Sequence, residues 1–290
     1  MLILLVFLLI LLPSAGANAA EARFAQAIMD TPVLNRSDFR GVFGGKDGNT
    51  VQTDRCGQPK AVEYVAPKGT LFRIEEELPV SGSTIFRVTT NEYPCPASRG
   101  CYIDARSVKL YSSSPGEREK TLPSQAVILA ALEGRVGTRY IWGGNVAAGI
   151  KELARWYPPS GAVDSGLWQL AGLDCSGLLY EATGGFTPRN SSELVAYGRG
   201  IKIAGKSAQE IGVALLPLDL IVWPGHVMIV LDHGRVIESR PVCGKPGEGV
   251  RIHPLREVLR GVMRTKRGVD TPAETAKEFS IRRWYDSAVR

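Results

Sequence analysis

A run of serine, proline and glycine, Ser112-Ser113-Ser114-Pro115-Gly116, separates two parts of the chain that differ in pattern. This composition is typical of linkers, and we place a linker at residues 111–121. The chain has 290 residues, enough for two domains, since a domain usually has about 100–200 residues. The break therefore predicts a small domain before it and a larger one after it.

Short strands dominate the part before the break. Thr84-Ile85-Phe86-Arg87-Val88-Thr89 alternates apolar and polar residues, which is the pattern of a half-buried strand. Four more strands are expected, at 62–65, 69–74, 102–105 and 107–110. We predict a small β domain over residues 38–112, after a lead-in at 20–37. The ordered motifs Lys68-Gly69-Thr70-Leu71, Phe86-Arg87-Val88, Gly100-Cys101-Tyr102-Ile103-Asp104-Ala105 and Val108-Lys109-Leu110 resemble bacterial SH3-like modules, which implies a small SH3-like β-barrel.

Helices and strands follow one another after the break. Apolar residues at helical spacing predict a helix at 124–132, and helix-compatible stretches follow at 176–182 and 191–197. Strands are expected at 218–223, 227–232 and 235–239, followed by a helix at 254–261. This order predicts an α+β domain over residues 122–290, in which 268–290 show no clear pattern.

The first residues have the pattern of a secretory signal peptide. An unbroken apolar run, Leu2 to Leu12, is followed by Ala17-Asn18-Ala19, a small-x-small cleavage site, although no Lys or Arg precedes the run. The alternative is an uncleaved anchor, but the run is shorter than the roughly 20 apolar residues of a spanning helix. We predict a signal peptide at 1–19, an exported protein of the periplasm or cell envelope, and no stable membrane insertion after cleavage.

The net charge of the chain excludes few classes of binding partner. A formal charge of +6 and a pI near 9.1 favour anionic surroundings. The densest basic block, Arg264-Thr265-Lys266-Arg267, is too small for a nucleic-acid site and is expected to be a solvated surface. We therefore expect no nucleic acid as a partner.

Five cysteines leave at least one thiol free, because disulfides use them in pairs. Cys95 and Cys101 flank a short loop and are expected to form a disulfide, whereas Cys56 and Cys243 have no partner that the sequence assigns. No Cys-x-x-Cys occurs, and the three histidines lack the spacing of a zinc site. We expect no metal and no cofactor.

The remaining cysteine, Cys175, lies at the predicted start of a helix, in Asp174-Cys175-Ser176-Gly177. A helix N-terminus and a nearby histidine favour the reactive thiolate, and backbone N–H groups at that position can hold an oxyanion. The structural alternative is a buried cysteine that acts as a small hydrophobic residue, or a cysteine that forms a disulfide with Cys243. On the cysteine alone the two interpretations are equally supported.

Two further residues complete a candidate triad. His226 opens a predicted strand after Pro224-Gly225 and is the expected base, and Glu238 on the next strand is the candidate that orients its ring. A two-residue turn through His233-Gly234 would set Glu238 opposite Ile229, on the face that His226 does not share. A three-residue loop would return Glu238 to the face of His226.

Five ordered segments carry a family resemblance over residues 122–245. They are Tyr140-Ile141-Trp142-Gly143-Gly144, Asp174-Cys175-Ser176-Gly177-Leu178, Pro188-Arg189-Asn190-Ser191-Ser192-Glu193, Gly225-His226-Val227-Met228-Ile229-Val230 and Val236-Ile237-Glu238. Together they resemble the NlpC-type family of bacterial cell-wall cysteine peptidases. The resemblance implies a papain-like fold, in which a helix-borne cysteine packs on an antiparallel sheet.

The resemblance also implies an activity and roles for residues. The substrate would be a peptidoglycan stem peptide, cut between D-glutamate and a diamino acid. Cys175 matches the nucleophile, His226 the base and Glu238 the third polar residue. Tyr140 matches a tyrosine that assists the oxyanion or the substrate. Asp174 and Ser176 match residues that contact the amine end of the peptide.

Two features depart from the family pattern. The third polar residue is usually histidine, and here it is Glu238, which would stabilise the imidazolium more strongly. A long insert, residues 145–173, separates Trp142-Gly143-Gly144 from Asp174. We interpret the insert as a lid or wall over the cleft, or alternatively as a peripheral excursion with its own small core.

Two other functions stay open on the sequence. One is an amidase that cuts the sugar–peptide linkage, or another hydrolase or transfer enzyme on the same scaffold. The other is a catalytically weak protein that binds the cell wall through the SH3-like module. A cysteine, a histidine and a polar third residue favour an active cysteine peptidase.

Overall fold

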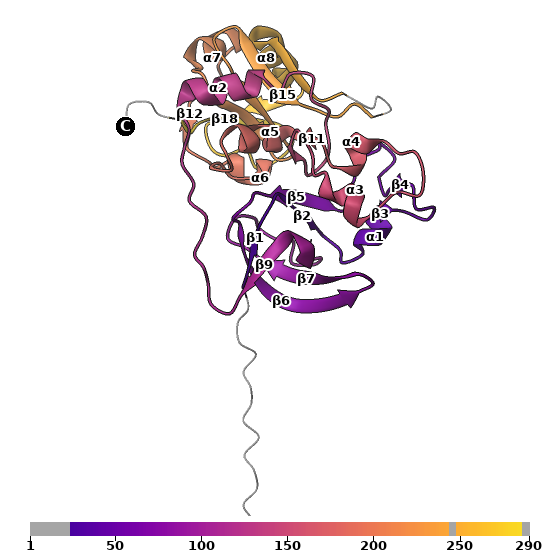
Figure 1. Cartoon of the computed structure of the whole chain (residues 1–290). Coiled ribbons are helices and arrows are strands. Elements are labelled where there is room, and N and C mark those ends of the chain that lie inside the picture. The colour runs from indigo at the N-terminus through magenta and orange to yellow at the C-terminus, as the bar shows by residue number, and fades with distance from the viewer. Residues whose placement is uncertain (1–23, 244–247, 286–290) are drawn as a thin grey trace, which may run out of the picture.

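The computed structural model describes residues 24–243 and 248–285 (Figure 1). The predicted signal peptide, residues 1–19, lies outside the described residues. In the part of the chain that is described, no helix has the length and apolar character needed to cross a membrane. Two seven-stranded groups of strands account for most of the architecture.

The N-terminal sheet contains seven strands in the order β5-β2-β8-β7-β6-β1-β9, all antiparallel. Its strands are β1 (Phe24–Ala27), β2 (Thr31–Leu34), β5 (Val62–Ala66), β6 (Leu71–Val80), β7 (Ser83–Thr89), β8 (Cys101–Asp104) and β9 (Val108–Tyr111). The five strands expected from the sequence are all present. The SH3-like assignment stays a prediction.

The N-terminal sheet begins earlier than the boundary expected at residue 38. β1 pairs with β6 and β9, and β2 pairs with β5, so residues 24–34 belong to the sheet and are not a lead-in. Both strands have only four residues, too few for a clear alternation, and β2 is buried throughout. Their place in the sheet is therefore set by pairing with distant strands.

Four short elements also belong to the N-terminal half. They are α1 (Phe39–Val42), β3 (Phe43–Gly44), β4 (Thr50–Val51) and the 3₁₀ turn η1 (Ala105–Ser107).

The C-terminal sheet has the order β12-β18-β13-β14-β15-β16 and is antiparallel, with β17 attached in parallel to β18. Its strands are β12 (Arg199–Ile201), β13 (Leu220–Trp223), β14 (His226–Val230), β15 (Arg235–Ser239), β16 (Val250–Pro254), β17 (Arg267–Gly268) and β18 (Glu278–Arg283). β18, from the segment without a clear pattern, inserts between β12 and β13. Helices and antiparallel sheets together make the mixed α and β architecture that the sequence predicted.

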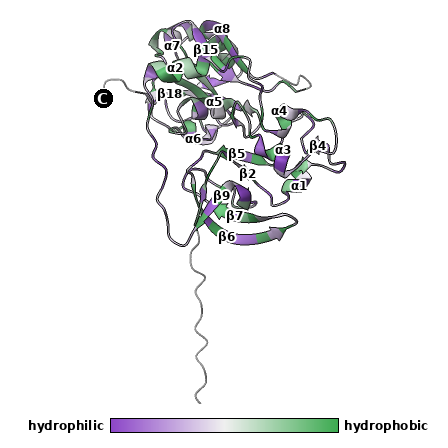
Figure 2. Ribbon diagram, in the orientation of Figure 1, coloured by the Kyte–Doolittle hydropathy of each residue, from purple (hydrophilic) through white to green (hydrophobic). Residues whose placement is uncertain are grey.

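Helices cover both faces of the C-terminal sheet (Figure 1). α2 (Gln125–Glu133), α5 (Cys175–Ala182) and α6 (Ser191–Leu194) pack on one face, and α7 (Ala208–Ala214) and α8 (Leu255–Met263) pack on the other. α6 is shorter than the helix expected at 191–197. α8 buries Leu255, Leu259 and Val262 and exposes charged residues between them, and Figure 2 shows this mixed character.

The insert at 145–173 contains β10 (Asn145–Val146), α3 (Glu152–Trp156), α4 (Ser165–Trp168) and β11 (Gly172–Leu173). Most of its buried side chains, Ile150 to Leu170, pack with those of the N-terminal sheet in one core, and the Tyr157 ring stacks on Phe43 at 5.6 Å between centroids, whereas Leu173 packs in the core of the C-terminal sheet. The insert therefore has no separate small core, as one alternative required. It joins the two halves of the molecule because its apolar residues are buried against the first one.

Covalent and polar links also hold the two halves together. The expected disulfide between Cys95 and Cys101 is present, and a second one joins Cys56 to Cys243 with a Cα–Cα distance of 4.7 Å. In the linker, Arg118 pairs with Glu92 of the first half and donates to the Gly185 carbonyl of the second at 3.0 Å. A disulfide, an ion pair and a hydrogen bond therefore connect the two halves.

Candidate active site

Cys175 is the first residue of α5, where the sequence placed it. Asp174 caps the helix, because its Oδ1 accepts the backbone N–H of Gly177 at 2.6 Å. The cysteine is 8% exposed and is the free cysteine among the described residues, since the other four form disulfides. The alternative pairing with Cys243 is therefore wrong, and the thiol is left at the positive end of a helix dipole.

Glycines bring α5 against the turn that precedes the insert. The Asp174 N–H donates to the Gly144 carbonyl at 2.9 Å, and a Cβ on Gly177 would lie 2.0 Å from that same oxygen. Gly143 has φ +72°, a left-handed conformation that glycine adopts without strain. The glycines of both motifs therefore serve close backbone packing beside Cys175.

His226 reaches the site from the start of β14. β13 and β14 form a tight hairpin in which Trp223 pairs with His226 across Pro224-Gly225, and Gly225 has φ +98°. The Trp223 and His226 rings lie 5.2 Å apart. The side chain of His226 is 13% exposed, so the ring is held by packing.

Glu238 lies beside His226 because of the register between β14 and β15. Ile229 pairs with Ile237, so Glu238 lies opposite Met228 and shares the face of His226. Leu231 N–H donates to the Arg235 carbonyl at 3.0 Å, which closes a loop of three residues. This is the loop that returns Glu238 to the face of His226. Its Oε2 lies 2.5 Å from His226 Nε2.

The charges of these groups depend on one another. Burial lowers the pKa of His226, but hydrogen bonds with Cys175 and Glu238 outweigh it and raise the pKa to about 9. Burial raises the pKa of Glu238, but its hydrogen bond with His226 lowers it below the usual range. Since Nε2 faces Glu238, Nδ1 is the ring nitrogen left for Cys175. His226 is therefore held in its charged form beside the Glu238 carboxylate.

His253 is a further neighbour of Glu238, and no role was predicted for it from the sequence. It belongs to β16, and its Nε2 lies 3.4 Å from Oε1 of Glu238. Its side chain is 40% exposed. The alternation of Val250-Arg251-Ile252-His253 was the signal for a strand, and the following proline masked it because proline commonly ends strands.

Tyr140 lies in the wall of the site next to Cys175. It is 8% exposed, and burial together with the nearby charges of Asp174 and Cys175 raises the pKa of its phenol. Its backbone N–H donates to the Glu248 carbonyl at 2.7 Å. The phenol therefore remains protonated and able to donate a hydrogen bond.

Asp174 and Ser176 belong to a buried polar network around Arg189. Arg189 is 1% exposed and donates to Asp174 Oδ2 at 2.7 Å, to Ser176 Oγ at 3.0 Å and to Asn145 Oδ1 at 3.0 Å. The Asp174 carboxylate also accepts the Gly143 N–H at 3.1 Å. Arg189 lies in one of the five motif segments, but no role was predicted for it from the sequence. A buried charge cannot be recognised from the sequence while the residue that pairs with it is unknown.

A cavity of about 680 Å³ borders the histidine side of the site. It is lined by Trp223, His226, Met228, Glu238, Arg240, Pro241, His253, Glu257, Val258, Gly261, Val262, Arg264, Thr265 and Lys266. No residue of the insert lines it. Among the described residues there is no group of three or more His, Cys, Asp or Glu side chains suited to a metal ion.

No family model matches the chain, and no curated protein matches its sequence. Among solved structures, it is similar to NlpC1 from Trichomonas vaginalis, with 13% identity and a TM-score of 0.33, over 91% of this chain and 69% of that one. NlpC2 from the same organism shows 14% identity and a TM-score of 0.31, over 91% and 74%. Similarity at this level carries no conclusion about function.

The three side chains can perform nucleophilic chemistry. A thiol at a helix N-terminus, a histidine whose pKa that thiol helps to raise and a carboxylate behind the histidine are the parts of an activated nucleophile. Backbone N–H groups at the start of α5, which the helix itself leaves without partners, can receive an oxyanion. Such a set is suited to nucleophilic attack on an acyl carbon.

Proposed function

We propose that the chain is an exported cysteine peptidase that hydrolyses peptidoglycan stem peptides, at the γ-D-glutamyl–diamino acid bond. The observation that supports the proposal is the 2.5 Å pairing of His226 Nε2 with Glu238 Oε2, together with Cys175 at the first position of α5, whose thiol is among the causes that raise the pKa of His226. The resemblance of the motifs to cell-wall peptidases supports the substrate class. Neither observation depends on the distant structural similarities.

The proposed reaction passes through an acyl-enzyme. The Cys175 thiolate attacks the carbonyl carbon, and the Cys175 N–H and the Tyr140 phenol stabilise the oxyanion. The C–N bond then breaks, and His226 gives its proton to the leaving amine. His226 next takes a proton from water, which attacks the thioester; the C–S bond breaks, the acid leaves, and the Cys175 thiolate and the protonated His226 are restored. Glu238 holds the imidazole ring throughout and favours its charged form.

Asp174 and Ser176 are proposed to shape the acyl side of the site. Asp174 already accepts a bidentate pair of bonds from Arg189, so its charge is largely compensated. Any contact with the amine end of the peptide would be shared with this guanidinium. Their main contribution is to hold the start of α5 in place.

Mass spectrometry of products from purified peptidoglycan fragments tests the proposal. The expected product is the dipeptide L-Ala-D-Glu, and the matched Cys175→Ala and His226→Ala variants should release none. Release of whole stem peptides would instead identify an amidase. A wild-type protein that binds cell walls but releases no product would leave the wall-binding function as the correct one.

A further inference from the structure

The cavity beside His226 is basic in character. Arg240, Arg264 and Lys266 line it, whereas its acids are Glu257 and Glu238, and Glu238 is already paired with His226. Such a surface attracts anionic groups, and a concave wall strengthens the local potential. The cavity therefore has the charge to receive a carboxylate.

The side chains of the two arginines are exposed. Within the described ranges, neither Arg240 nor Arg264 has a side-chain hydrogen bond or ion pair, although the charge of Arg240 is one of the causes that lower the pKa of Glu238. Lys266, by contrast, lies over the Trp223 ring at 4.5 Å and donates to the Ala276 carbonyl. A guanidinium pairs with a carboxylate through two parallel hydrogen bonds, which makes Arg240 and Arg264 the available ligands.

The cavity lies on one side of the reacting thiol. His226 and Glu238 line it, but Cys175, Tyr140 and Asp174 do not. In the proposed reaction His226 protonates the leaving amine, so that amine and the residue attached to it lie next to His226. The acyl part of the substrate, held by Cys175, lies toward the other side.

We propose that this cavity binds the leaving amino acid of the substrate through a carboxylate of that residue, which Arg240 and Arg264 pair with. The inference rests on the proposed function, because it takes the leaving group to be a diamino acid. The two arginines would then determine which leaving amino acid the enzyme accepts. A diamino acid with free carboxylates is preferred over one whose carboxylates are amidated.

Kinetics on two synthetic peptides test the inference. Both are L-Ala-γ-D-Glu-diaminopimelate tripeptides, and the carboxylates of the diamino acid are free in one and amidated in the other. Arg240→Gln and Arg264→Gln should each raise KM for the free peptide about fivefold, the upper range for an exposed ion pair, with kcat unchanged. KM for the amidated peptide should stay within about twofold in both variants.

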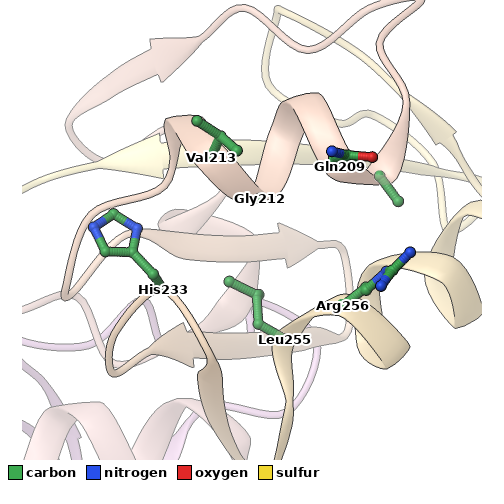
Figure 3. Close-up of a pocket in the computed structure, with 7 residues that line it drawn as sticks. Gln209, Gly212, Val213, His233, Leu255 and Arg256 are labelled. Atoms are coloured by element: carbon green, nitrogen blue, oxygen red, sulfur yellow. The ribbon is translucent and has the colours of Figure 1, made fainter.

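Arg256→Gln is the matched control. Arg256 lies on α8, the helix that Arg264 caps at its C-terminus, but it lines a different cavity of about 450 Å³ between α7 and α8, with Gln209 and His233 (Figure 3). This variant should behave as the wild type on both peptides. Because the arginines are exposed, all three variants should keep the wild-type melting temperature.

The outcomes separate this inference from the proposed function. If the wild type cleaves neither peptide, the proposed function is wrong and the inference falls with it. If the wild type cleaves both peptides with equal kcat/KM, and Arg240→Gln and Arg264→Gln match Arg256→Gln, the function stands and the inference is wrong. Selective loss on the free peptide supports both.

Discussion

Oε2 of Glu238 lies 2.5 Å from Nε2 of His226, although the two residues are on different strands and 12 residues apart in the chain. The contact exists because a three-residue loop sets the register of β14 and β15. A slip of one residue would turn Glu238 to the opposite face. The charge state of His226 therefore depends on the pairing of two strands.

Replacing Glu238 by glutamine should reduce kcat/KM by roughly 10²–10⁴-fold, because the amide neither stabilises the imidazolium nor selects its orientation as firmly. The loss should be smaller than for Cys175→Ala, since the nucleophile remains. Steady-state kinetics on stem-peptide fragments measure both. Glu133→Gln, which removes an exposed partner of Arg235, is the control and should stay near the wild type. Equal activity of Glu238→Gln and wild type would contradict the role of Glu238.

Raising the pH should remove both activity and stability through His226. The pKa of His226 is raised from 6.5 to about 9 in the fold, so its stabilising contribution is complete below pH 6.5 and is lost as the pH rises through about 9. The contribution amounts to about 3 kcal/mol. Rates and urea unfolding measured from about pH 6 to pH 10 should show an alkaline limb near pH 9.

The exposed His233 supplies the control for this pH dependence. His233→Gln should leave the alkaline limb where it is, whereas Glu238→Gln should move it to lower pH by removing one of the bonds that raise the pKa of His226. An alkaline limb that does not move in Glu238→Gln would show that another group titrates.

Gly177→Ala should damage the site from within the backbone. The new Cβ would lie 2.0 Å from the Gly144 carbonyl oxygen, so the start of α5 must shift, at a cost of about 1–3 kcal/mol. Urea unfolding measures the cost, and kinetics measure the loss of rate as Cys175 moves. Gly212→Ala in α7 is the matched control, since its Cβ would meet Leu259 at an ordinary 3.6 Å. The control should gain about 0.5–1 kcal/mol from the helix propensity of alanine.

Arg189→Met should lower the free energy of unfolding by about 3–5 kcal/mol, because it leaves the Asp174 carboxylate buried without its partner. The double variant Arg189→Met with Asp174→Asn should recover part of this loss, since no lone charge is then buried. Arg235→Met, which removes pairs with Glu133 and Asp232 on the surface, should change stability by less than about 0.5 kcal/mol. Chemical denaturation of the three variants provides the comparison. Equal losses in the single and double variants would contradict the pairing argument.

Much of the fold could be predicted because the signals are local. Ser124 and Asp174 each cap a helix within a few residues of themselves, and strands such as β7 show their alternation directly. β1, β2 and β18 were not predicted as strands, because short or fully buried strands have no clear period and depend on partners elsewhere. The helix expected at 191–197 stops at Leu194, and the carbonyls of residues 196–198 accept hydrogen bonds from the distant Arg282 instead.

The candidate site shows the same difference between residues with local signals and residues that depend on distant contacts. Its three candidate residues were found from motifs, while His253 and Arg189 were missed because their importance lies in distant contacts with Glu238 and Asp174. The insert at 145–173 was expected over the cleft or as a separate unit, and it shares the core of the N-terminal sheet instead. Its apolar residues showed that it must be buried, but the surface that buries it is formed by residues far away in the chain.

The sequence alone predicted three features: the helix that begins at Cys175, the strand that begins near His226, and the short loop closed by Cys95 and Cys101. Each of them depends on residues that are close together in the chain. The pairing of Cys56 with Cys243, the contact of Glu238 with His226 and the burial of Arg189 came only from the assembled molecule. Such contacts are decided by strand register and by the packing of whole layers. Those depend on many weak interactions at once, and no short stretch of sequence records their sum.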